Sequence, residues 1–385
     1  MRCYMKNTKL VFSFVAAITL IFISCGPLLA QKEEKSLQKV LTSKNLKEIY
    51  EIRALKIKTI TERSYRADEK GNITGVYDTE TIERFNEEGN LIENELIKYD
   101  EGARRHIPVQ KWNSSLNANG LAETEILYYY DQKQGGYIES KKWNYEYDEK
   151  NNLTVQTAHN VPAGTVIEKI INKYDEKNNK IETARYGADK LIDTAAYKYD
   201  INKNELECLI TGADGNIIQK TVNAYDEGGI KVVTAHYQGA ECLIDKKIAY
   251  NKLACVLNIE NYSGGELFST VYNAYDDSGN KTEETEITAS GARLYLETYA
   301  YDQLNNLTEK TRYNGQKRIE SKEVYKYDEF NRKTGEFYYG GGDKLKLNKS
   351  VINSFNNLRR IEESKAFDEK QKPLYKNIYS YEYNQ

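Results

Sequence analysis

The stretch that decides the fold reads Tyr275-Asp276-Asp277-Ser278-Gly279-Asn280. Tyr is enriched in β-strands, whereas Asp, Ser, Gly and Asn are enriched in turns. Asp and Asn side chains can accept nearby backbone N–H groups, and Gly permits a positive φ without steric cost. The hexapeptide therefore predicts the end of a strand and a tight turn directly after it.

The same signal recurs along most of the chain, and internal repeats of this kind indicate a repeat architecture. Successive copies of the Tyr position lie 25 to 28 residues apart. Two less regular copies, Phe85-Asn86 and Tyr99-Asp100, come earlier. The regular copies begin at Tyr147, Tyr174, Tyr199, Tyr225, Tyr250, Tyr275, Tyr301, Tyr327, Phe355 and Tyr383.

One unit, residues 174–200, shows what each repeat contains. After the first Tyr-Asp turn, residues 180–186 alternate as a strand, and residues 187–189 form a second turn. Residues 191–199 then form a second strand that leads into the next Tyr-Asp pair. Helical spacing is missing, and β-branched and aromatic residues fill the runs between turns. The sequence thus predicts an all-β protein of tandem antiparallel β-hairpins, a meander.

The pattern Tyr-Asp-x-x-Gly-Asn resembles the YD repeat of Rhs, insecticidal toxin-complex and teneurin proteins. The resemblance covers roughly residues 60–385, and Phe85-Asn86-Glu87-Glu88-Gly89-Asn90 is nearly the same motif. It implies a spiralling β-sheet shell, often with a large cargo inside, although this chain is much shorter. Because strongly twisted sheets curl as they widen, we expect a curled or spiral single sheet.

The first residues predict export. A positive start is followed by Leu10 to Ile23, which is almost continuously apolar and about as long as a signal-peptide core. Phe22-Ile23-Ser24-Cys25 resembles a bacterial lipobox, which implies lipidation of Cys25; ordinary cleavage after Ala30 is the alternative. The resulting division is a signal peptide at 1–24, a tether or short helix at 25–55, and the repeat domain at 56–385.

These features predict a lipoprotein anchored in the bacterial cell envelope, periplasmic or on the surface, or else a secreted protein. Removal of residues 1–24 takes away three positive charges and no acid, which changes the net charge from -3 to -6. A basic footprint for nucleic acid is therefore missing, and no nucleic-acid partner is expected.

Segment 101–145 breaks the pattern and is expected to be irregular, as a decayed repeat or an inserted loop. Trp112 and Trp143 both occur in Lys-Trp-Asn, which indicates one repeat slot; a ligand platform is the alternative. In Tyr-x-Tyr-Asp units the two Tyr share one strand face, which predicts aromatic ladders, or else glycan contacts. The candidate ligand-contact residues are Trp112, Trp143, Tyr299, Tyr301, Tyr325 and Tyr327.

No catalytic set emerges from the sequence. His159 and His236 each follow a Thr-Ala pair, which places them at expected exposed strand positions. Cys208, Cys242 and Cys255 match no metal-binding spacing. The acidic turns lack the length and terminal Glu of an EF-hand loop. We therefore expect no enzyme, no cofactor and no metal site.

The expected function is a non-enzymatic, exported envelope or cell-surface scaffold that binds a macromolecular partner, either a protein or a glycan. One alternative is a glycan-binding surface module. Another is a short relative of an Rhs-type toxin shell. Exposed Tyr rows would favour the glycan module, and buried Tyr would count against it.

Overall fold

The structure is a computed structural model that describes residues 49–239, 241, 243–342 and 344–384. The predicted signal peptide at 1–24, the lipidation site Cys25, the tether residues 25–48 and Cys242 lie outside the described residues. A short helical segment spans residues 49–54 and directly precedes the first strand. None of the described helical residues forms a helix long and apolar enough to cross a membrane.

Twenty-four β-strands follow, and their bounds match the hairpin unit that the repeats predict. They are β1 Ile57–Arg66, β2 Thr79–Phe85, β3 Leu91–Asp100, β4 Arg105–Leu116, β5 Ala122–Asp131, β6 Gly136–Tyr147, β7 Leu153–Asn160, β8 Thr165–Tyr174, β9 Lys180–Gly187, β10 Lys190–Tyr199, β11 Glu205–Gly212, β12 Ile217–Tyr225, β13 Lys231–Gln238, β14 Leu243–Tyr250, β15 Val256–Ser263, β16 Glu266–Tyr275, β17 Lys281–Thr288, β18 Arg293–Tyr301, β19 Leu307–Asn314, β20 Ile319–Tyr327, β21 Lys333–Gly340, β22 Lys346–Phe355, β23 Ile361–Asp368 and β24 Pro373–Tyr383.

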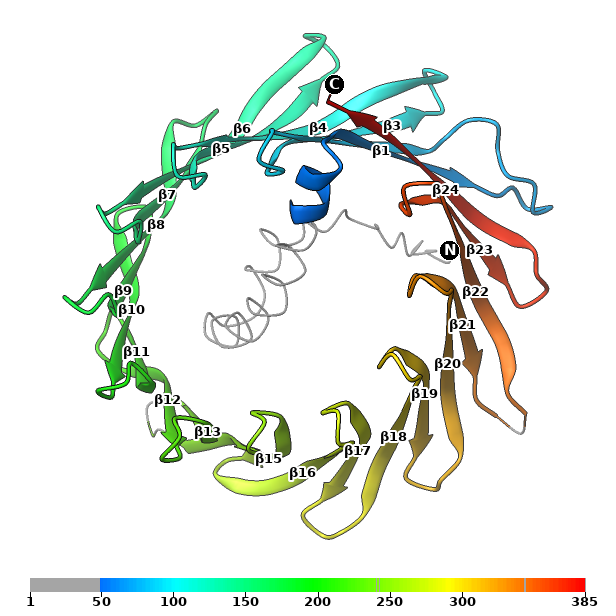
Figure 1. Ribbon diagram of the computed structural model, residues 1–385. Coiled ribbons are helices and arrows are strands. Elements are labelled where there is room, and N and C mark those ends of the chain that lie inside the picture. Colours follow the sequence, from blue (N-terminus) through cyan, green and yellow to red (C-terminus); the bar gives the residue numbers. More distant parts are fainter. Residues whose placement is uncertain (1–48, 240, 242, 343, 385) are drawn as a thin grey trace, which may run out of the picture.

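Each strand pairs antiparallel with the next, and β24 pairs antiparallel with β1. The sheet is therefore a closed barrel (Figure 1). The expectation of an open curled or spiral sheet is wrong, whereas the all-β antiparallel meander is confirmed. At the seam, Ile60 lies opposite Tyr381 and Arg66 lies opposite Tyr375. The backbone N–H of Asn384 also donates to the carbonyl of Lys56 at 2.8 Å.

Bulges explain why the meander curves enough to close. Every pair of neighbouring strands except β1–β2 contains a register shift. In β10, for example, the pairing passes from Leu191 to Asp193 and skips Ile192. Bulges bend strands and increase their twist. Because they recur in nearly every pair, the curvature adds up around the sheet.

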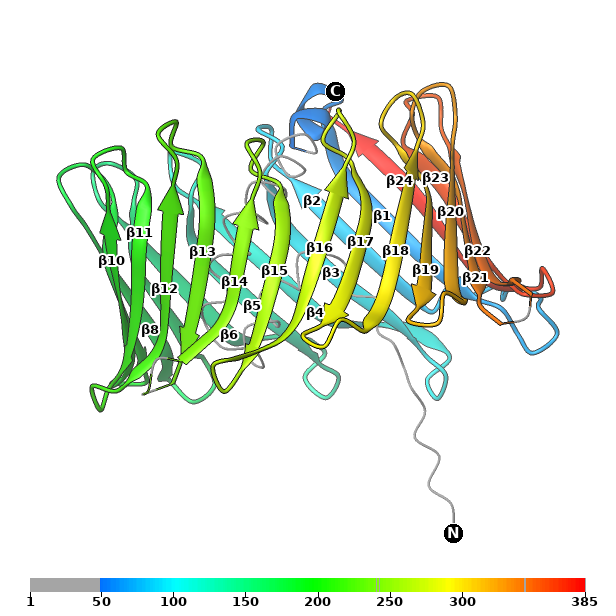
Figure 2. The same ribbon diagram turned by 90° about the horizontal axis from the view of Figure 1, so that it is seen from below.

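Turns join the strands at both ends of the barrel (Figure 2). Even-numbered strands from β2 to β22 run to one end, which we call the Tyr-Asp rim; odd-numbered strands run to the opposite rim. In the turn after β16, the Gly279 N–H donates to the Asp276 carbonyl at 3.0 Å. Gly279 has a φ of 82°, and Asn305 fills the same turn position with a φ of 62°. Gly and Asn tolerate this left-handed conformation, which explains their place in the repeat.

One face of the sheet lines the inside of the ring. We define the tyrosine face as the strand face that carries the Tyr of each Tyr-Asp pair and the equivalent Phe85. Helix 49–54 lies inside the ring (Figure 1), and its Ile52 is buried in one cluster with Ile57 and Phe85, against which Tyr381 packs. Because Phe85 and Tyr381 belong to the tyrosine face, this face is the inner wall.

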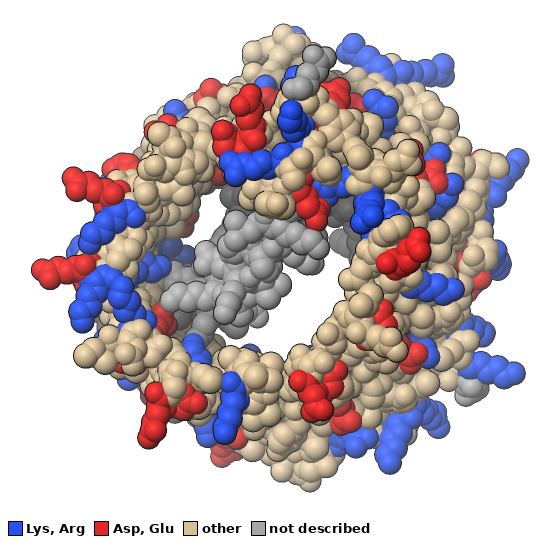
Figure 3. Space-filling view, viewed as in Figure 1, with Lys and Arg blue, Asp and Glu red and all other residues tan. Residues whose placement is uncertain are grey.

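Segment 101–145, for which the sequence predicts irregularity, contains β4, β5 and β6 in the same meander. β4 and β6 have 12 residues each, whereas β7 and β9 have 8. Because these strands are longer and their apolar residues are spaced differently, the repeat is not recognisable in the sequence of this segment. Figure 3 views the ring from the Tyr-Asp rim and shows both charge signs interspersed around it.

Candidate functional site

The inner wall is ordered by the hydroxyls of the repeated tyrosines. In seven repeats the hydroxyl of the repeated tyrosine donates to the backbone carbonyl of the first residue of the preceding strand, across the same hairpin. In the last repeat Tyr381, two residues before Tyr383, makes the equivalent bond. The oxygen-to-oxygen distances run from 2.7 to 3.0 Å. The pairs are Tyr147–Ala122, Tyr174–Leu153, Tyr199–Lys180, Tyr225–Glu205, Tyr275–Val256, Tyr301–Lys281, Tyr327–Leu307 and Tyr381–Ile361.

These bonds replace the aromatic ladders that the sequence predicts. Pairs of aromatic rings in contact occur among Tyr65, Tyr77, Tyr99, His106, Tyr128, Tyr130 and Tyr137. A carbonyl at a strand start has a free lone pair after the ladder bonds are made. The tyrosine hydroxyl uses this lone pair, so the repeated Tyr fastens neighbouring strands near the Tyr-Asp rim.

The residue two positions before each tyrosine that makes this carbonyl bond has two forms. In one form it is Asn, whose amide donates to the same carbonyl as the Tyr: Asn223 reaches Glu205 at 2.8 Å. In the other form it is Tyr, whose hydroxyl donates to a carboxylate on the wall: Tyr145 reaches Glu125 at 2.8 Å and Tyr379 reaches Glu62 at 2.9 Å. In both forms the side chain donates to an acceptor on the wall.

Burial changes the acid–base properties of this wall. It raises the pKa of Tyr225, Tyr275 and Tyr381 to about 12. Burial, together with Glu297, also raises the pKa of Tyr299. Desolvation disfavours the charged phenolate, and a neighbouring carboxylate disfavours it further. The wall tyrosines are therefore neutral hydrogen-bond donors at physiological pH.

Glu297 is a junction in the wall and is only 6% exposed. It accepts from the Tyr299 hydroxyl at 2.6 Å and from Arg312 Nη1 at 2.9 Å, and it pairs with Lys310 Nζ at 3.1 Å. Burial alone would raise the pKa of Glu297, but these three partners outweigh burial and lower its pKa. A buried charge with partners on all sides is tolerated, and it fixes the side chains around it.

The Asp of each pair caps its own turn, which confirms the predicted Asx-turn. The carboxylate of Asp276 accepts from the backbone N–H of Ser278 at 3.0 Å and of Asn280 at 2.8 Å. The Asn280 amide also donates to it at 3.0 Å. The side-chain hydrogen bond from Asn280 is the largest cause that lowers the pKa of Asp276. These carboxylates thus serve turn formation, and no group of three or more potential metal ligands occurs among the described residues.

Replacing Asn356, which fills the Asp position of the turn after β22, tests this role. It accepts from the N–H groups of Leu358 and Arg360, both at 3.0 Å. Asn356→Ala removes both bonds and is expected to lower the free energy of unfolding by about 0.5–2 kcal/mol, measured by urea denaturation. Asn356→Asp is the matched control and should be near neutral, because Asp276 fills the same position. Equal losses for both variants would contradict the capping role.

The candidate ligand-contact residues all lie on the inner wall. Trp143 lies opposite Glu125, Trp112 lies opposite Leu127, and Glu125 and Leu127 share one face of β5. Both Trp residues are half-buried and lie three positions after a bulged residue, so they occupy one repeat slot. The four tyrosines are half-buried, and their hydroxyls are bonded: Tyr301 and Tyr327 to carbonyls, and Tyr299 and Tyr325 to Glu297 and Glu323.

The two histidines of the Thr-Ala pairs differ from expectation and from each other. His236 is buried, 9% exposed, and its Nδ1 lies 3.1 Å from the Thr221 hydroxyl. The exposed position predicted for it is therefore wrong. His159 is half-buried, and its Nε2 lies 3.1 Å from the Asn144 amide nitrogen. Cys208 is buried and Cys255 half-buried, and neither forms a disulfide with another described residue.

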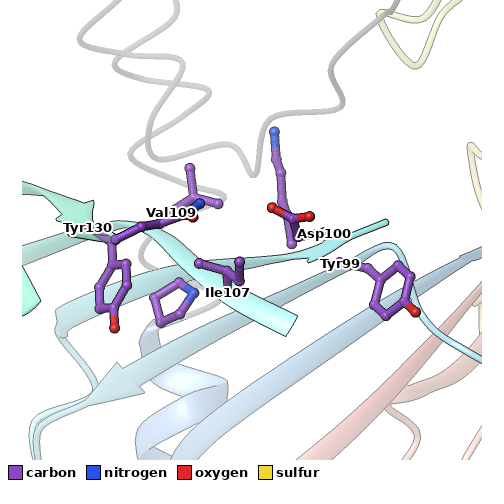
Figure 4. Close-up of a pocket in the computed structure, with 8 residues that line it drawn as sticks. Tyr99, Asp100, Ile107, Val109 and Tyr130 are labelled. Carbon is purple, nitrogen blue, oxygen red and sulfur yellow. The ribbon is translucent and has the colours of Figure 1, made fainter. Parts of the chain in front are cut away.

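Sequence reasoning missed an aromatic group on the outer face of β3 and β4, formed by Tyr99 and His106 with Tyr77 from the segment before β2. The ring of His106 stacks on Tyr77 with centroids 3.7 Å apart, and Tyr99 lies 5.2 Å from His106. Nearby, a shallow pocket of about 210 Å³ is lined by residues of β3, β4 and β5 that include Tyr99, Ile107 and Tyr130 (Figure 4). The only sequence feature that pointed to this aromatic group is the short separation between Tyr99-Asp100 and His106.

Comparisons with known proteins give distant structural neighbours only. No family model and no curated protein matches the chain. The TcdB2-TccC3 crystal structure aligns at 10% identity with a TM-score of 0.28, covering 82% of this chain and 22% of that chain. A porin-like protein from Bacteroides uniformis aligns at 9% identity with a TM-score of 0.20, covering 85% of this chain and 98% of its own.

A third neighbour is a DUF3836 family protein from Parabacteroides distasonis, at 13% identity with a TM-score of 0.17. It covers 28% of this chain and 87% of its own length. The chain therefore spans about a fifth of the TcdB2-TccC3 structure and is much longer than the DUF3836 protein.

Proposed function

We propose that this protein is a non-enzymatic, exported scaffold of the bacterial envelope that holds a protein partner against its inner wall. The observation that carries the proposal is the order of that wall. Tyrosine hydroxyls are already bonded to carbonyls or carboxylates, so the half-buried rings are held at fixed positions. A surface that is ordered in advance loses little conformational entropy when a partner binds.

The wall offers aromatic surface as well as rigidity. Trp112 and Trp143 lie on neighbouring even-numbered strands, and Lys281 Nζ lies 4.8 Å from the ring centre of Tyr299. Rigid aromatic side chains supply large contact area at low entropic cost, which is why they dominate binding surfaces. Export and anchoring rest on the apolar segment Leu10 to Ile23 and on Cys25.

A pull-down from envelope extracts tests the scaffold, with the chain from Gly26 onward as bait, because it retains all described residues. Partners found by mass spectrometry are then purified and rebound. We expect Trp112→Leu with Trp143→Leu to weaken rebinding by about tenfold or more, since aromatic anchors contribute over about 1 kcal/mol each. Tyr128→Leu with Tyr130→Leu, on the outer face of the same region, is the matched control and should rebind normally.

The scaffold proposal would be overturned if none of the partners depended on the inner wall for rebinding. The anchor is tested separately by mass spectrometry of the protein from its native membrane. An acylated Cys25 as first residue supports the anchor, and a first residue of Gln31 would show ordinary secretion instead.

A glycan ligand is the second candidate, and the placement of Trp112 and Trp143 favours it. Two half-buried indole rings on one wall present flat apolar surfaces of the kind that sugar rings contact. A glycan array probed with the same bait distinguishes the two. Saturable glycan binding that the Trp112→Leu, Trp143→Leu variant loses, without any wall-dependent protein partner, would make the glycan module the main function.

A further inference from the structure

Apolar side chains project from the tips of the Tyr-Asp rim in the C-terminal half of the ring. They occupy the third position of the turn, two residues after its Asp or Asn. Leu253 is 66% exposed, Leu304 is 65%, Phe330 is 46% and Leu358 is 48%. These residues lie in the turns after β14, β18, β20 and β22, and we call them the apolar tips.

The turn itself does not require an apolar residue at this position. Ser278 occupies it in the turn after β16, and Lys150 occupies it in the turn after β6. Both donate their backbone N–H to the Asp carboxylate at 2.9–3.0 Å, as Leu304 does at 2.9 Å. The side chain of the tip therefore contributes nothing to the turn. Four apolar residues at these tips indicate an apolar environment outside the ring.

The spacing of the apolar tips favours a lipid surface over a protein partner. Neighbouring turns on one rim are two strands apart, which is about 10 Å at the usual strand spacing. A protein partner is best matched by a contiguous apolar patch, whereas a fluid bilayer receives separate side chains at any spacing. Phe330 also carries Arg359 at 4.2 Å and Arg332 at 5.1 Å from its ring centre. Aromatic rings with attached cations suit the headgroup region of a bilayer.

The segment that precedes the first strand also lies at this rim. Helix 49–54 lies beside the turns of the Tyr-Asp rim, since Glu51 pairs with Arg360 at 2.9 Å. Arg360 ends the same turn that carries Leu358. Residues 26–48 span at most about 80 Å when extended, so an anchor at Cys25 and the apolar tips can reach one membrane together.

We infer that the apolar tips insert into the lipid surface to which the chain is anchored, so that the barrel stands with its Tyr-Asp rim on the membrane. This inference rests on the proposed envelope location. The anchor brings the rim close, and the tips fix its orientation. Each apolar side chain that leaves water adds to binding, and Arg359 beside Phe330 adds attraction to anionic headgroups.

Vesicle flotation tests the inference with the unacylated chain from Gly26, so that no lipid anchor contributes. The vesicles contain phosphatidylethanolamine and phosphatidylglycerol. We expect the unaltered chain to float with the vesicles. The triple variant Leu304→Ser, Phe330→Ser, Leu358→Ser should partition into them at least about tenfold more weakly. Serine is accepted at this position by the turn of Ser278, so the variant should fold, which circular dichroism checks.

The matched control removes three equally exposed apolar residues away from the tips. Ile192, Ile218 and Leu294 are 43%, 43% and 42% exposed at bulges nearer the opposite rim. Their triple Ser variant should float like the unaltered chain. Equal loss in both variants, or no flotation of the unaltered chain, would overturn the inference. The inference would also be overturned if light scattering showed that the unaltered chain is a dimer and that only the variant of the apolar tips is a monomer. The pull-down and Cys25 acylation do not depend on vesicles, so they separate failure here from failure of the proposed function.

Discussion

Replacing Ile52 with Ala is expected to lower the free energy of unfolding by about 2–5 kcal/mol, the largest effect of any single substitution considered. Ile52 is 2% exposed and packs with Ile57 and Phe85 beside the seam where β1 meets β24. The substitution leaves a cavity under the strand that closes the ring. Urea denaturation followed by circular dichroism measures the loss.

Ile201→Ala is the matched control for this prediction. It makes the same chemical change at a turn residue that is 85% exposed, so the loss should stay within about 0.5 kcal/mol. Similar losses at both positions would show that helix 49–54 does not stabilise the seam. If the seam opens, β1 and β24 become free edges, and size-exclusion chromatography should then show self-association.

Raising the pH from 10 to 12 is expected to unfold the barrel cooperatively. The ordinary pKa of tyrosine is 10.0, and burial raises that of Tyr225, Tyr275 and Tyr381 to about 12 in the folded state. In this window the unfolded chain has lost these protons and the folded chain has not. The free energy of unfolding therefore falls as the pH rises. The stabilisation that these three tyrosines give is fully present only below pH 10.

The measurement follows tyrosinate absorbance and circular dichroism along one alkaline titration. The wall tyrosines should ionise together with unfolding rather than before it. Tyr225→Phe with Tyr275→Phe loses two hydroxyl bonds and should cost about 1–3 kcal/mol at neutral pH, yet its stability should fall less steeply above pH 10. Phe355 shows that the slot accepts Phe. Full ionisation of a barrel that is still folded would refute the buried hydroxyl bonds.

The sequence predicts the repeat unit well because its signals are local. The turn chemistry of Asp276 to Asn280 depends on residues four positions apart, and the hairpin that follows needs only neighbouring strands. Closure could not be predicted in this way. It depends on a ladder between residues 57–66 and 375–383, and on bulges such as Ile192 that the apolar pattern does not show.

The candidate site was predicted in position more than in chemistry. The slot shared by Trp112 and Trp143 follows from their common Lys-Trp-Asn context, and the shared face of Tyr299 and Tyr301 follows from strand periodicity. The carbonyl that each tyrosine hydroxyl reaches lies 19 to 25 residues earlier and has no sequence signature. The Glu297 junction likewise joins two strands through side chains that periodicity does not single out.

The pairing of β24 with β1 also constrains how this chain can change in length. Antiparallel pairing all the way round a ring requires an even number of strands. Loss or gain of one strand would leave two parallel neighbours at the join, so only whole hairpins can be added or removed. Each added hairpin would lengthen the circumference by about 10 Å and widen the ring by about 3 Å. Duplication of a single unit of about 25 residues is thus the smallest step by which such a ring can evolve a wider bore.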